Sequence, residues 1–245
     1  MRALVMAAGL GTRLKPLTDT LPKPLVPVLG RPMVAYVLEQ LAEQGIREAV
    51  LNIHYFPEKM RAFAEEWNRA GKAPRLEIQD ESGLLLDSGG SIPRAAGWLF
   101  AKETTALVCN ADVLAKPDLA SLAREHARLR EQFGVECTLA VTPHPETGRK
   151  YNGLRRASDG RLTAFVEKTG TPDPTLFHFP GYYLLEKSAL PRLPAVGTPC
   201  GIKEKLWAPL AAEGKLGSYI YEDYYLDLGT PADLRHAEEF LSARA

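Results

Sequence analysis

The chain has 245 residues, of which 45% are hydrophobic, and its thirty basic side chains balance thirty acidic ones. This length supports a large α/β domain with a buried core, and this composition excludes disorder as the main state. The balanced charge argues against nucleic acid or a membrane surface as a partner. No apolar run reaches the length of about eighteen residues that would predict a transmembrane span.

Three cysteines without a Cys-x-x-Cys pair are too few for a disulfide framework or a zinc knuckle, so we expect a reducing, cytoplasmic compartment. The first residues, Met1–Gly9, contain an apolar run that is short for a signal peptide, and a basic, proline-rich segment follows. This pattern favours a buried first strand over a cleaved leader.

Hydrophobic periodicity predicts alternating strands and helices in the first part of the chain. Short apolar runs indicate buried strands at Ala3–Ala7, Ala49–Ile53, Leu76–Gln79, Ala106–Cys109 and Cys137–Val141. Apolar residues at helical spacing predict helices around Met33–Leu41, Pro57–Trp67 and Leu119–Leu129. Such alternation is typical of an α/β fold with a doubly wound, mostly parallel, Rossmann-like sheet.

After about residue 141 the pattern changes to shorter strands and turns, which predict a small antiparallel patch beside the main sheet. The expected strands are Leu154–Ala157, Leu162–Val166 and Tyr182–Leu185. A helix near Ile202–Ala212, strands at Leu216–Tyr221 and Tyr224–Asp227, and a last helix from Pro231 to about Ala243 follow. We therefore expect a single domain, 1–245, with a lid-like insertion at about 142–200.

The segment Gly9–Val28 follows the first strand, where doubly wound sheets bind ligands. Gly9 and Gly11 would permit positive φ and close approach of a phosphate. Cations and many prolines follow, so the charges would be held in place; the cations are Arg13, Lys15 and Lys23. A dinucleotide fingerprint is excluded because its third glycine is Leu14 here, and a P-loop lacks its Gly-Lys-Ser/Thr end. The alternative is a solvated surface loop.

Motifs along essentially the whole chain resemble those of the sugar-1-phosphate nucleotidyltransferases, which join an NTP to a sugar 1-phosphate and release pyrophosphate. The run Gly-x-Gly-Thr-Arg-Leu-x-Pro-Leu-Thr, followed by Pro-Lys-Pro, resembles the signature of this family. The other matching segments are Ser88–Ile92 (a glycine turn near the nucleobase), Leu107–Val113, Phe165–Lys168 and Leu226–Pro231.

The resemblance implies a role for each motif residue. Arg13 would hold the β- and γ-phosphates, Lys23 would lie near the α-phosphate, and both would act in catalysis with Asp112. The expected nucleotide-binding residues are Ala8, Gly9, Gly11, Thr12, Arg13, Lys23, Ser88 and Gly89. The attacking phosphate oxygen is already ionised near neutral pH, so stabilisation of charge, and not a general base, is what the reaction needs.

Asp112 and Asp227 would bind Mg²⁺, which prefers carboxylate oxygens and completes its shell with water and substrate phosphate. Both aspartates end predicted strands, and parallel-sheet topology could bring such ends together. For Asp112 an alternative is a cap on the helix near Pro117. For Asp227 capping is less needed, because Thr230 and the residues after it already form a helix start.

The sugar phosphate would be bound by Lys168, with Gly153, Glu167 and Gly181 around it, so that the insertion at about 142–200 becomes the sugar-binding part. An asparagine that contacts a sugar hydroxyl in many relatives is absent from the stretch before Gly181. The short length and the Ser88–Gly90 turn most resemble the small uridylyltransferases of N-acetylmuramate 1-phosphate recycling. This resemblance implies UTP with N-acetylmuramate 1-phosphate, in cell-wall NDP-sugar biosynthesis.

Two alternatives remain open at this point. One is a GTP-dependent mannose- or heptose-1-phosphate guanylyltransferase, which would have a similar glycine pair. The other is a non-catalytic, sugar-nucleotide-binding regulatory subunit, although such a chain would be expected to lose a residue such as Arg13 or Asp227. We expect an NTP and a sugar 1-phosphate as partners, no nucleic acid or membrane, and a monomer or small homo-oligomer.

Overall fold

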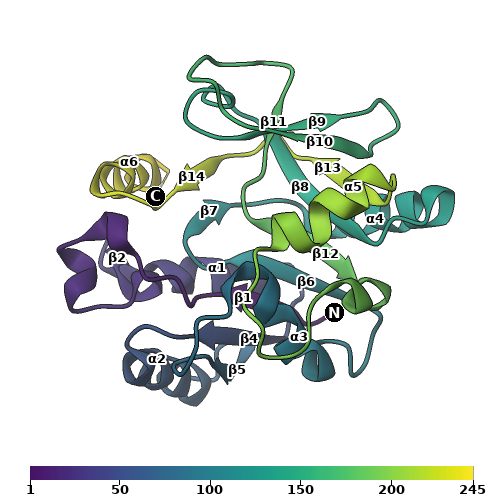
Figure 1. Ribbon diagram of the computed structural model, residues 1–245. Coiled ribbons are helices and arrows are strands. Elements are labelled where there is room, and N and C mark those ends of the chain that lie inside the picture. The colour runs from purple at the N-terminus through teal and green to yellow at the C-terminus, as the bar shows by residue number, and fades with distance from the viewer. Residues whose placement is uncertain (245) are drawn as a thin grey trace. The chain divides into compact units, whose positions relative to one another are not determined.

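The computed structural model describes residues 1–244, which form two units. The first unit comprises residues 1–86, 109–116 and 224–244, and the second comprises residues 87–108 and 117–223. Strand β6 (Thr105–Asn110) begins in the second unit and ends in the first. The elements are labelled in Figure 1, and each unit is described separately below.

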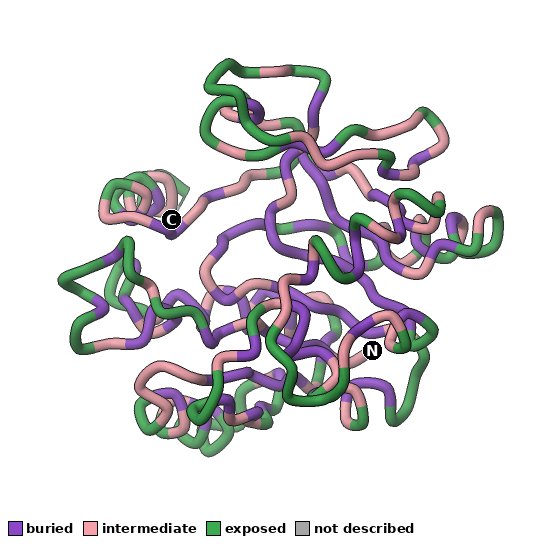
Figure 2. Tube along the Cα trace, in the orientation of Figure 1, coloured by how far each residue is buried: buried purple, intermediate pink, exposed green. Residues whose placement is uncertain are grey.

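The first unit is built on parallel strands in the order β1, β4, β5. Their bounds are Ala3–Met6 (β1), Glu48–Ile53 (β4) and Arg75–Asp80 (β5). Ala3 lies opposite Ala49, and Glu48 lies opposite Arg75. β1 and β4 are almost entirely buried (Figure 2), which explains why both are continuous apolar runs in the sequence.

The helices of this unit are α1 (Met33–Glu43), α2 (Pro57–Arg69) and α6 (Pro231–Ser242). α2 begins at Pro57 because proline fits the first helical turn, and it buries Met60, Ala64 and Trp67 on one face. α6 begins as predicted: the hydroxyl of Thr230 accepts a hydrogen bond from the Asp233 amide at 3.2 Å.

Short elements occupy the proline-rich part and the ends of the first unit. They are 3₁₀ turns at Thr12–Leu14, Leu17–Asp19 and Lys23–Leu25, and strands β2 (Pro27–Val28), β3 (Arg31–Pro32), β7 (Val113–Ala115) and β14 (Tyr225–Asp227). β14 pairs antiparallel with β7, and Asp227 lies opposite Val113. The prediction that parallel strands bring Asp112 and Asp227 together is therefore corrected, because this small antiparallel pair does so.

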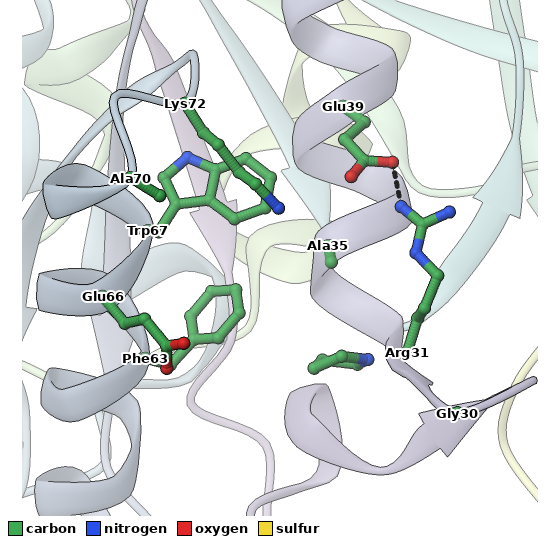
Figure 3. A pocket seen from close by; sticks show the side chains of 10 residues that line it. Gly30, Arg31, Ala35, Glu39, Phe63, Glu66, Trp67, Ala70 and Lys72 are labelled. Atoms are coloured by element: carbon green, nitrogen blue, oxygen red, sulfur yellow. Dashed lines mark hydrogen bonds and ion pairs between the residues drawn. The ribbon is translucent and has the colours of Figure 1, made fainter.

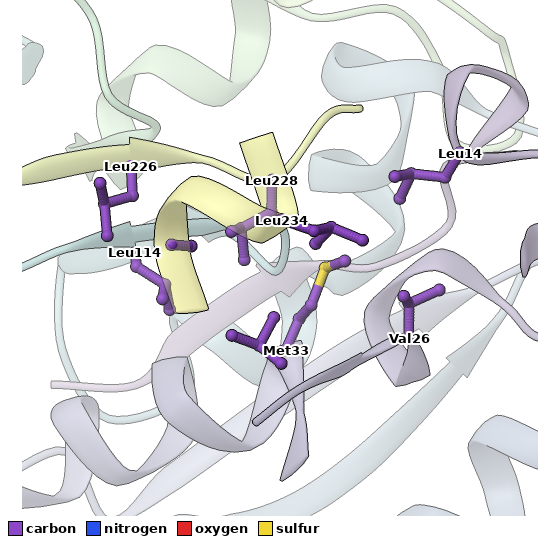
Figure 4. Close-up of a cluster of buried hydrophobic side chains, with 9 residues drawn as sticks. Leu14, Val26, Met33, Leu114, Leu226, Leu228 and Leu234 are labelled. Carbon is purple, nitrogen blue, oxygen red and sulfur yellow. The ribbon is translucent and has the colours of Figure 1, made fainter. Parts of the chain in front are cut away.

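A buried apolar cluster joins the two ends of the chain within the first unit (Figure 4). Its members are Leu14, Val26, Val28, Met33, Leu114, Leu226, Leu228, Leu234 and Ala237. The proline-rich segment thus contributes its apolar side chains to the same core as β14 and α6. That packing holds the segment after the glycine loop against the last helix.

The second unit is a mixed sheet around β8 (Cys137–Pro143). β13 (Leu216–Ile220) pairs with β8 in parallel, whereas β11 (Phe177–His178) and β12 (Tyr182–Glu186) pair with it antiparallel. The antiparallel pair β9 (Gly153–Arg156) and β10 (Leu162–Val166) extends the sheet beyond β11.

The helices of the second unit are α3 (Asp87–Leu99), α4 (Leu119–Phe133) and α5 (Ala208–Ala212). A π-helical turn at Lys203–Trp207 precedes α5, and a 3₁₀ helix covers Lys187–Arg192. Asp118 caps α4 by accepting hydrogen bonds from two amides of its first turn.

The glycine turn predicted at Ser88–Gly90 is wrong, because these residues form the first turn of α3. Two glycines and Pro93 lower the helix propensity of this stretch, so its sequence does not look helical. The helix forms there with Gly89 and Gly90 buried.

The predicted fold class is confirmed: the chain is α/β, with a mostly parallel sheet and a smaller antiparallel part. Within the described residues, no helix has the length and apolar character needed to cross a membrane. The prediction of one catalytic domain over 1–245 stays a prediction.

Candidate active site

A pocket of about 200 Å³ in the first unit gathers residues from the glycine loop, from the turn between β6 and β7, and from the loop after β14. Its lining residues are Gly9, Gly11, Thr12, Arg13, Lys23, Asp112 and Gly229. All of these except Gly229 were predicted from the sequence as nucleotide-binding, catalytic or metal-binding residues. The structure therefore brings together residues more than 200 positions apart in the chain.

Gly11 is the glycine on which the loop depends. Its φ is +65°, and a Cβ placed there would lie 2.9 Å from the side chains of both Lys23 and Thr18. The Thr18 hydroxyl donates a hydrogen bond to the Gly11 carbonyl at 2.8 Å and braces the loop. Gly9 does not have the predicted positive φ; it is exposed, with open space beside its Cα, which leaves room for a ligand.

Lys23 and Asp112 form an ion pair inside this pocket. The Lys23 Nζ lies 2.5 Å from Asp112 Oδ2, and the Lys23 side chain is only 8% exposed. Asp112 is not the cap of α4, because Asp118 has that role. A lysine that is already paired and desolvated keeps a fixed position, so its charge is pre-organised for a phosphate.

Asp227 lies beside the same pocket, next to the lining residue Gly229. A Cβ at Gly229 would lie 3.0 Å from both Asp227 Oδ1 and an Arg13 guanidinium nitrogen, so both groups border this glycine. Burial raises the pKa of Asp227 above its usual range, and the nearby carboxylates of Asp233 and Asp112 add to the rise, while Lys23 and Arg13 oppose it. Lys23 and Arg13 therefore do not fully offset the effects of burial and of the neighbouring carboxylates on Asp227.

The two aspartates suit a hard divalent cation. Both present carboxylate oxygens, and the raised pKa of Asp227 shows an environment that a cation would relieve. Among residues 1–244 no group of three or more His, Cys, Asp or Glu side chains is arranged as a metal site. A pair of carboxylates matches Mg²⁺, which keeps several waters and takes its other ligands from phosphates.

Other predicted residues of the first unit lie around this pocket or outside it. Ala8 is buried directly before the exposed Gly9. Lys15, the third cation of the loop, is exposed and pairs with Asp19 at 3.2 Å. It does not line the pocket.

In the second unit, Ser88 and Gly89 are bonded to the segment Cys200–Ile202. The Gly89 amide donates to the Cys200 carbonyl at 2.8 Å, and the Ser88 hydroxyl accepts from the Ile202 amide at 3.1 Å. A Cβ at Gly89 would lie 2.7 Å from the Cys200 sulfur. Glycine is needed here for this packing, and the nucleotide contact predicted for these two residues stays a prediction.

Glu167 and Lys168 follow β10 and are both exposed. Lys203 Nζ lies 2.5 Å from Glu167 Oε1, and this hydrogen bond and charge lower the pKa of Glu167. The Lys168 amide donates to Asn152 Oδ1 at 3.0 Å, and the Lys168 Nζ lies 3.4 Å from the Lys150 carbonyl. The motif is therefore fixed by neighbours on two other segments.

The two predicted sugar-site glycines have different structural reasons. Gly153 is buried in β9, where a Cβ would lie 2.5 Å from Leu176. Gly181 has a φ of +95°, which only glycine adopts readily.

Sequence reasoning missed Gly229, Asn152 and Lys203. Gly229 could have been found, since it stands two residues after Asp227 in the same motif. Asn152 stands in a turn next to the predicted Gly153, which is only weak evidence of a role in the site. The sequence does not indicate a role for Lys203, because its partner Glu167 is 36 positions away.

A larger pocket, of about 260 Å³, lies between α1 and α2 in the first unit (Figure 3). Phe63 and Trp67 form one wall, and Arg31, which pairs with Glu39, lies on the other. Lys72 Nζ lies 4.9 Å from the centre of the Trp67 ring. None of the predicted site residues lines it, so size alone does not identify the site.

A family model described as "Nucleotidyl transferase" matches residues 2–244. The mannose-1-phosphate guanylyltransferase of Mycobacterium tuberculosis is 31% identical over 233 residues, which are 94% of this chain and 62% of that protein. The mannose-1-phosphate guanyltransferase of Aspergillus fumigatus is 31% identical over 234 residues, covering 95% and 62%. The chain thus spans 62% of the length of these relatives.

Among solved structures, the chain is similar to the crystal structure of HddC from Yersinia pseudotuberculosis complexed with GMP-PN. The TM-score is 0.78, the identity is 21%, and the match covers 98% of this chain and 99% of that one. This likeness supports the fold.

Proposed function

The chain belongs to the nucleotidyl transferase family, and on that premise we propose that it transfers a nucleoside monophosphate from an NTP to a sugar 1-phosphate. The products would be an NDP-sugar and pyrophosphate. The observation that carries this proposal is the pocket of the first unit, where Arg13, Lys23, Asp112 and the neighbouring Asp227 meet at a glycine loop.

The side chains of this pocket answer the difficulty of the reaction, which is to bring two polyanions together. Arg13 is exposed and can pair with the β- and γ-phosphates, so that it stabilises the leaving pyrophosphate. Lys23 is fixed by Asp112 and would stabilise the charge that develops at the α-phosphate. The sugar phosphate attacks as an anion, so no side chain has to accept its proton.

Asp112 and Asp227 would hold Mg²⁺, which supplies charge neutralisation and alignment of the phosphates when it is bound. Lys168, fixed through Asn152, would bind the phosphate of the incoming sugar, next to the ionised Glu167. In this proposal the glycine-loop residues act on the NTP, and Lys168 acts on the sugar 1-phosphate, so their substitution should affect different kinetic constants.

For the nucleotide, the relatives favour GTP over UTP. The matching proteins from Mycobacterium tuberculosis, Aspergillus fumigatus and rice carry the name mannose-1-phosphate guanylyl- or guanyltransferase, or its probable form. We therefore propose guanylyl transfer to a hexose 1-phosphate such as mannose 1-phosphate as the first pair to test. The UTP and N-acetylmuramate 1-phosphate pair expected from sequence has no support among these relatives.

The test is pyrophosphate release with GTP, UTP, dTTP, CTP and ATP against mannose, glucose and N-acetylmuramate 1-phosphates, with and without Mg²⁺. We expect the highest kcat/KM with GTP and mannose 1-phosphate. A tenfold or larger preference for UTP would restore the other pair and leave the reaction class intact. No release with any pair would contradict the proposed function.

A further inference from the structure

Aromatic side chains of the second unit gather around Trp207. The Phe165 ring is parallel to it, with ring centres 6.3 Å apart and an angle of 2°. The Phe179 ring meets it edge-on at 5.0 Å and 72°, and Tyr183 does the same at 5.1 Å and 89°. We call Phe165, Phe179 and Trp207 the aromatic wall.

The wall connects the two segments that carry the proposed sugar contacts. Phe165 stands two residues before Glu167, and Phe179 stands two residues before Gly181. Both rings touch the same indole, so these segments, which are distant in sequence, are held side by side.

The π-helical turn supplies the centre of the wall and a cation beside it. Lys203 and Trp207 are its first and last residues. Lys203 Nζ lies 5.7 Å from the centre of the Phe165 ring and also pairs with Glu167. An apolar ring surface and an ionised carboxylate therefore lie next to each other. π-Helical turns are rare and frequently mark functional sites.

The exposure of the rings shows where a ligand could lie. Trp207 and Tyr183 are buried, whereas Phe165 and Phe179 are only half-buried, so part of each of these two residues is accessible. A sugar ring has matching chemistry: its C–H groups form an apolar face, and its hydroxyl groups form a polar rim. Aromatic rings bind such apolar faces, and a carboxylate accepts hydrogen bonds from hydroxyl groups.

We infer that the aromatic wall receives the C–H face of the sugar ring at Phe179 and Phe165, beside the Glu167 carboxylate that the motif resemblance already assigns to the sugar. This inference rests on the proposed function, because it assumes that the second unit binds the sugar 1-phosphate. Phe179 is then a specificity-determining residue. It favours pyranose 1-phosphates with an unbroken apolar face.

The test measures contact and affinity separately from turnover. In saturation-transfer NMR of the full chain, irradiation of aromatic protons should transfer to the ring C–H protons of bound mannose 1-phosphate or glucose 1-phosphate. Calorimetry gives the Kd of the same sugar phosphates. The variants are Phe179→Leu, which keeps apolar volume, and Phe179→Tyr, which keeps the ring. Phe133→Leu is the control, since Phe133 is a half-buried phenylalanine of the same unit that contacts Arg161.

We expect Phe179→Leu to weaken sugar-phosphate binding about two- to tenfold and to reduce the NMR transfer, with the KM for the NTP unchanged. Phe133→Leu should bind as the unmodified chain does, and Phe179→Tyr, which keeps the ring, should lose less affinity and less NMR transfer than Phe179→Leu. Melting temperatures of all variants confirm that they are folded. Unchanged Kd and unchanged transfer in Phe179→Leu would overturn the inference.

The same experiment separates this inference from the proposed function. Sugar-phosphate binding that depends on Phe179, without pyrophosphate release with any NTP, would support the wall and contradict the proposed reaction. If pyrophosphate is released and the KM for the sugar 1-phosphate is the same in Phe179→Leu as in the unmodified chain, the reaction is supported and the role of the aromatic wall is contradicted.

Discussion

The charged residues of the two units are held in different ways. In the first unit Lys23 is 8% exposed and is paired with Asp112, whereas in the second unit Glu167 is 70% exposed and Lys203 is 35% exposed. Buried charges are rigid and are little screened by salt, whereas exposed pairs contribute little and lose strength as salt rises. Residues of the first site should therefore control turnover, and residues of the second should mainly control affinity for the sugar.

The largest effect should follow from removal of a carboxylate in the first unit. Asp112→Ala and Asp227→Ala should each lower kcat by on the order of 10²–10³, because each removes a pre-organised charge contact. Steady-state pyrophosphate release at saturating Mg²⁺ measures this. Asp118→Ala is the matched control: it removes the cap of α4, costs about 1 kcal/mol of stability and should leave kcat unchanged. Activity of folded Asp227→Ala within twofold of the unmodified chain would contradict the assignment.

A methyl group at Gly229 should have the next largest effect. Its Cβ would lie 3.0 Å from both Arg13 and Asp227, so one or both must shift. Displacement of catalytic groups by about 1 Å can cost up to 10²-fold in rate, and we expect a loss of about 10- to 100-fold in kcat/KM. Gly83→Ala is the control, because a Cβ placed at Gly83 would meet nothing within 4 Å. Equal activity of the two variants would show that Arg13 and Asp227 do not act through this contact.

Comparison of Arg13→Ala with Lys168→Ala tests the difference between the units directly. Arg13→Ala should lower kcat with the NTP, because it removes a contact to the leaving pyrophosphate. Lys168→Ala should raise the KM for the sugar 1-phosphate roughly tenfold, with a small change in kcat. Titration of each substrate at saturating concentrations of the other separates these effects. If Lys168→Ala weakens NTP binding alone, the two roles are wrongly assigned.

The second unit also contains buried charge, and this should act on stability instead of activity. Glu186 is 5% exposed, and His126 Nε2 lies 2.9 Å from its Oε1. Burial opposes ionisation of Glu186, but hydrogen bonds from His126 and Thr105 outweigh it and lower its pKa. The stabilisation is therefore present above the unfolded pKa of about 4.3 and is lost as the pH falls through the lower folded value.

Glu186→Gln should lower the free energy of unfolding by about 1–3 kcal/mol at pH 7, and the difference should shrink below about pH 4. Urea unfolding at both pH values measures it. Glu125→Gln breaks a partly exposed pair with Arg128 and should change stability by only about 0–1 kcal/mol. A loss for Glu186→Gln that is constant with pH would contradict an ionised Glu186 in the folded chain.

The first unit could be predicted well because its information is local. The apolar runs give β1 and β4 within one residue of their observed bounds, and Pro57 marks the start of α2. The glycine loop, Arg13 and Lys23 stand in one continuous segment, so their gathering into one pocket follows from the motif. The motif does not predict the ion pair between Asp112 and Lys23, because these residues lie far apart in the sequence.

The second unit was harder to predict for physical reasons. α3 forms over a Gly-Gly-containing stretch because tertiary packing of Gly89 on Cys200 outweighs its low helix propensity. The pair of Glu167 with Lys203 and the stacking of Phe165 on Trp207 join segments about 40 positions apart, and no periodicity encodes such contacts. Both depend on the folded arrangement of β10 and the π-helical turn.

The core cluster around Met33 has a consequence for how the chain is made on the ribosome. Leu226, Leu228 and Leu234 enter this cluster from residues that are synthesised after the whole second unit, and Asp227 arrives with them. Residues 87–108 and 117–223 have been translated by then, so the second unit can fold first although the glycine loop emerges before it. A nascent chain arrested on a C-terminal linker, so that residue 223 has left the ribosomal exit tunnel and residues 224–245 are missing, should therefore protect the second unit from protease while residues 1–86 remain cleavable.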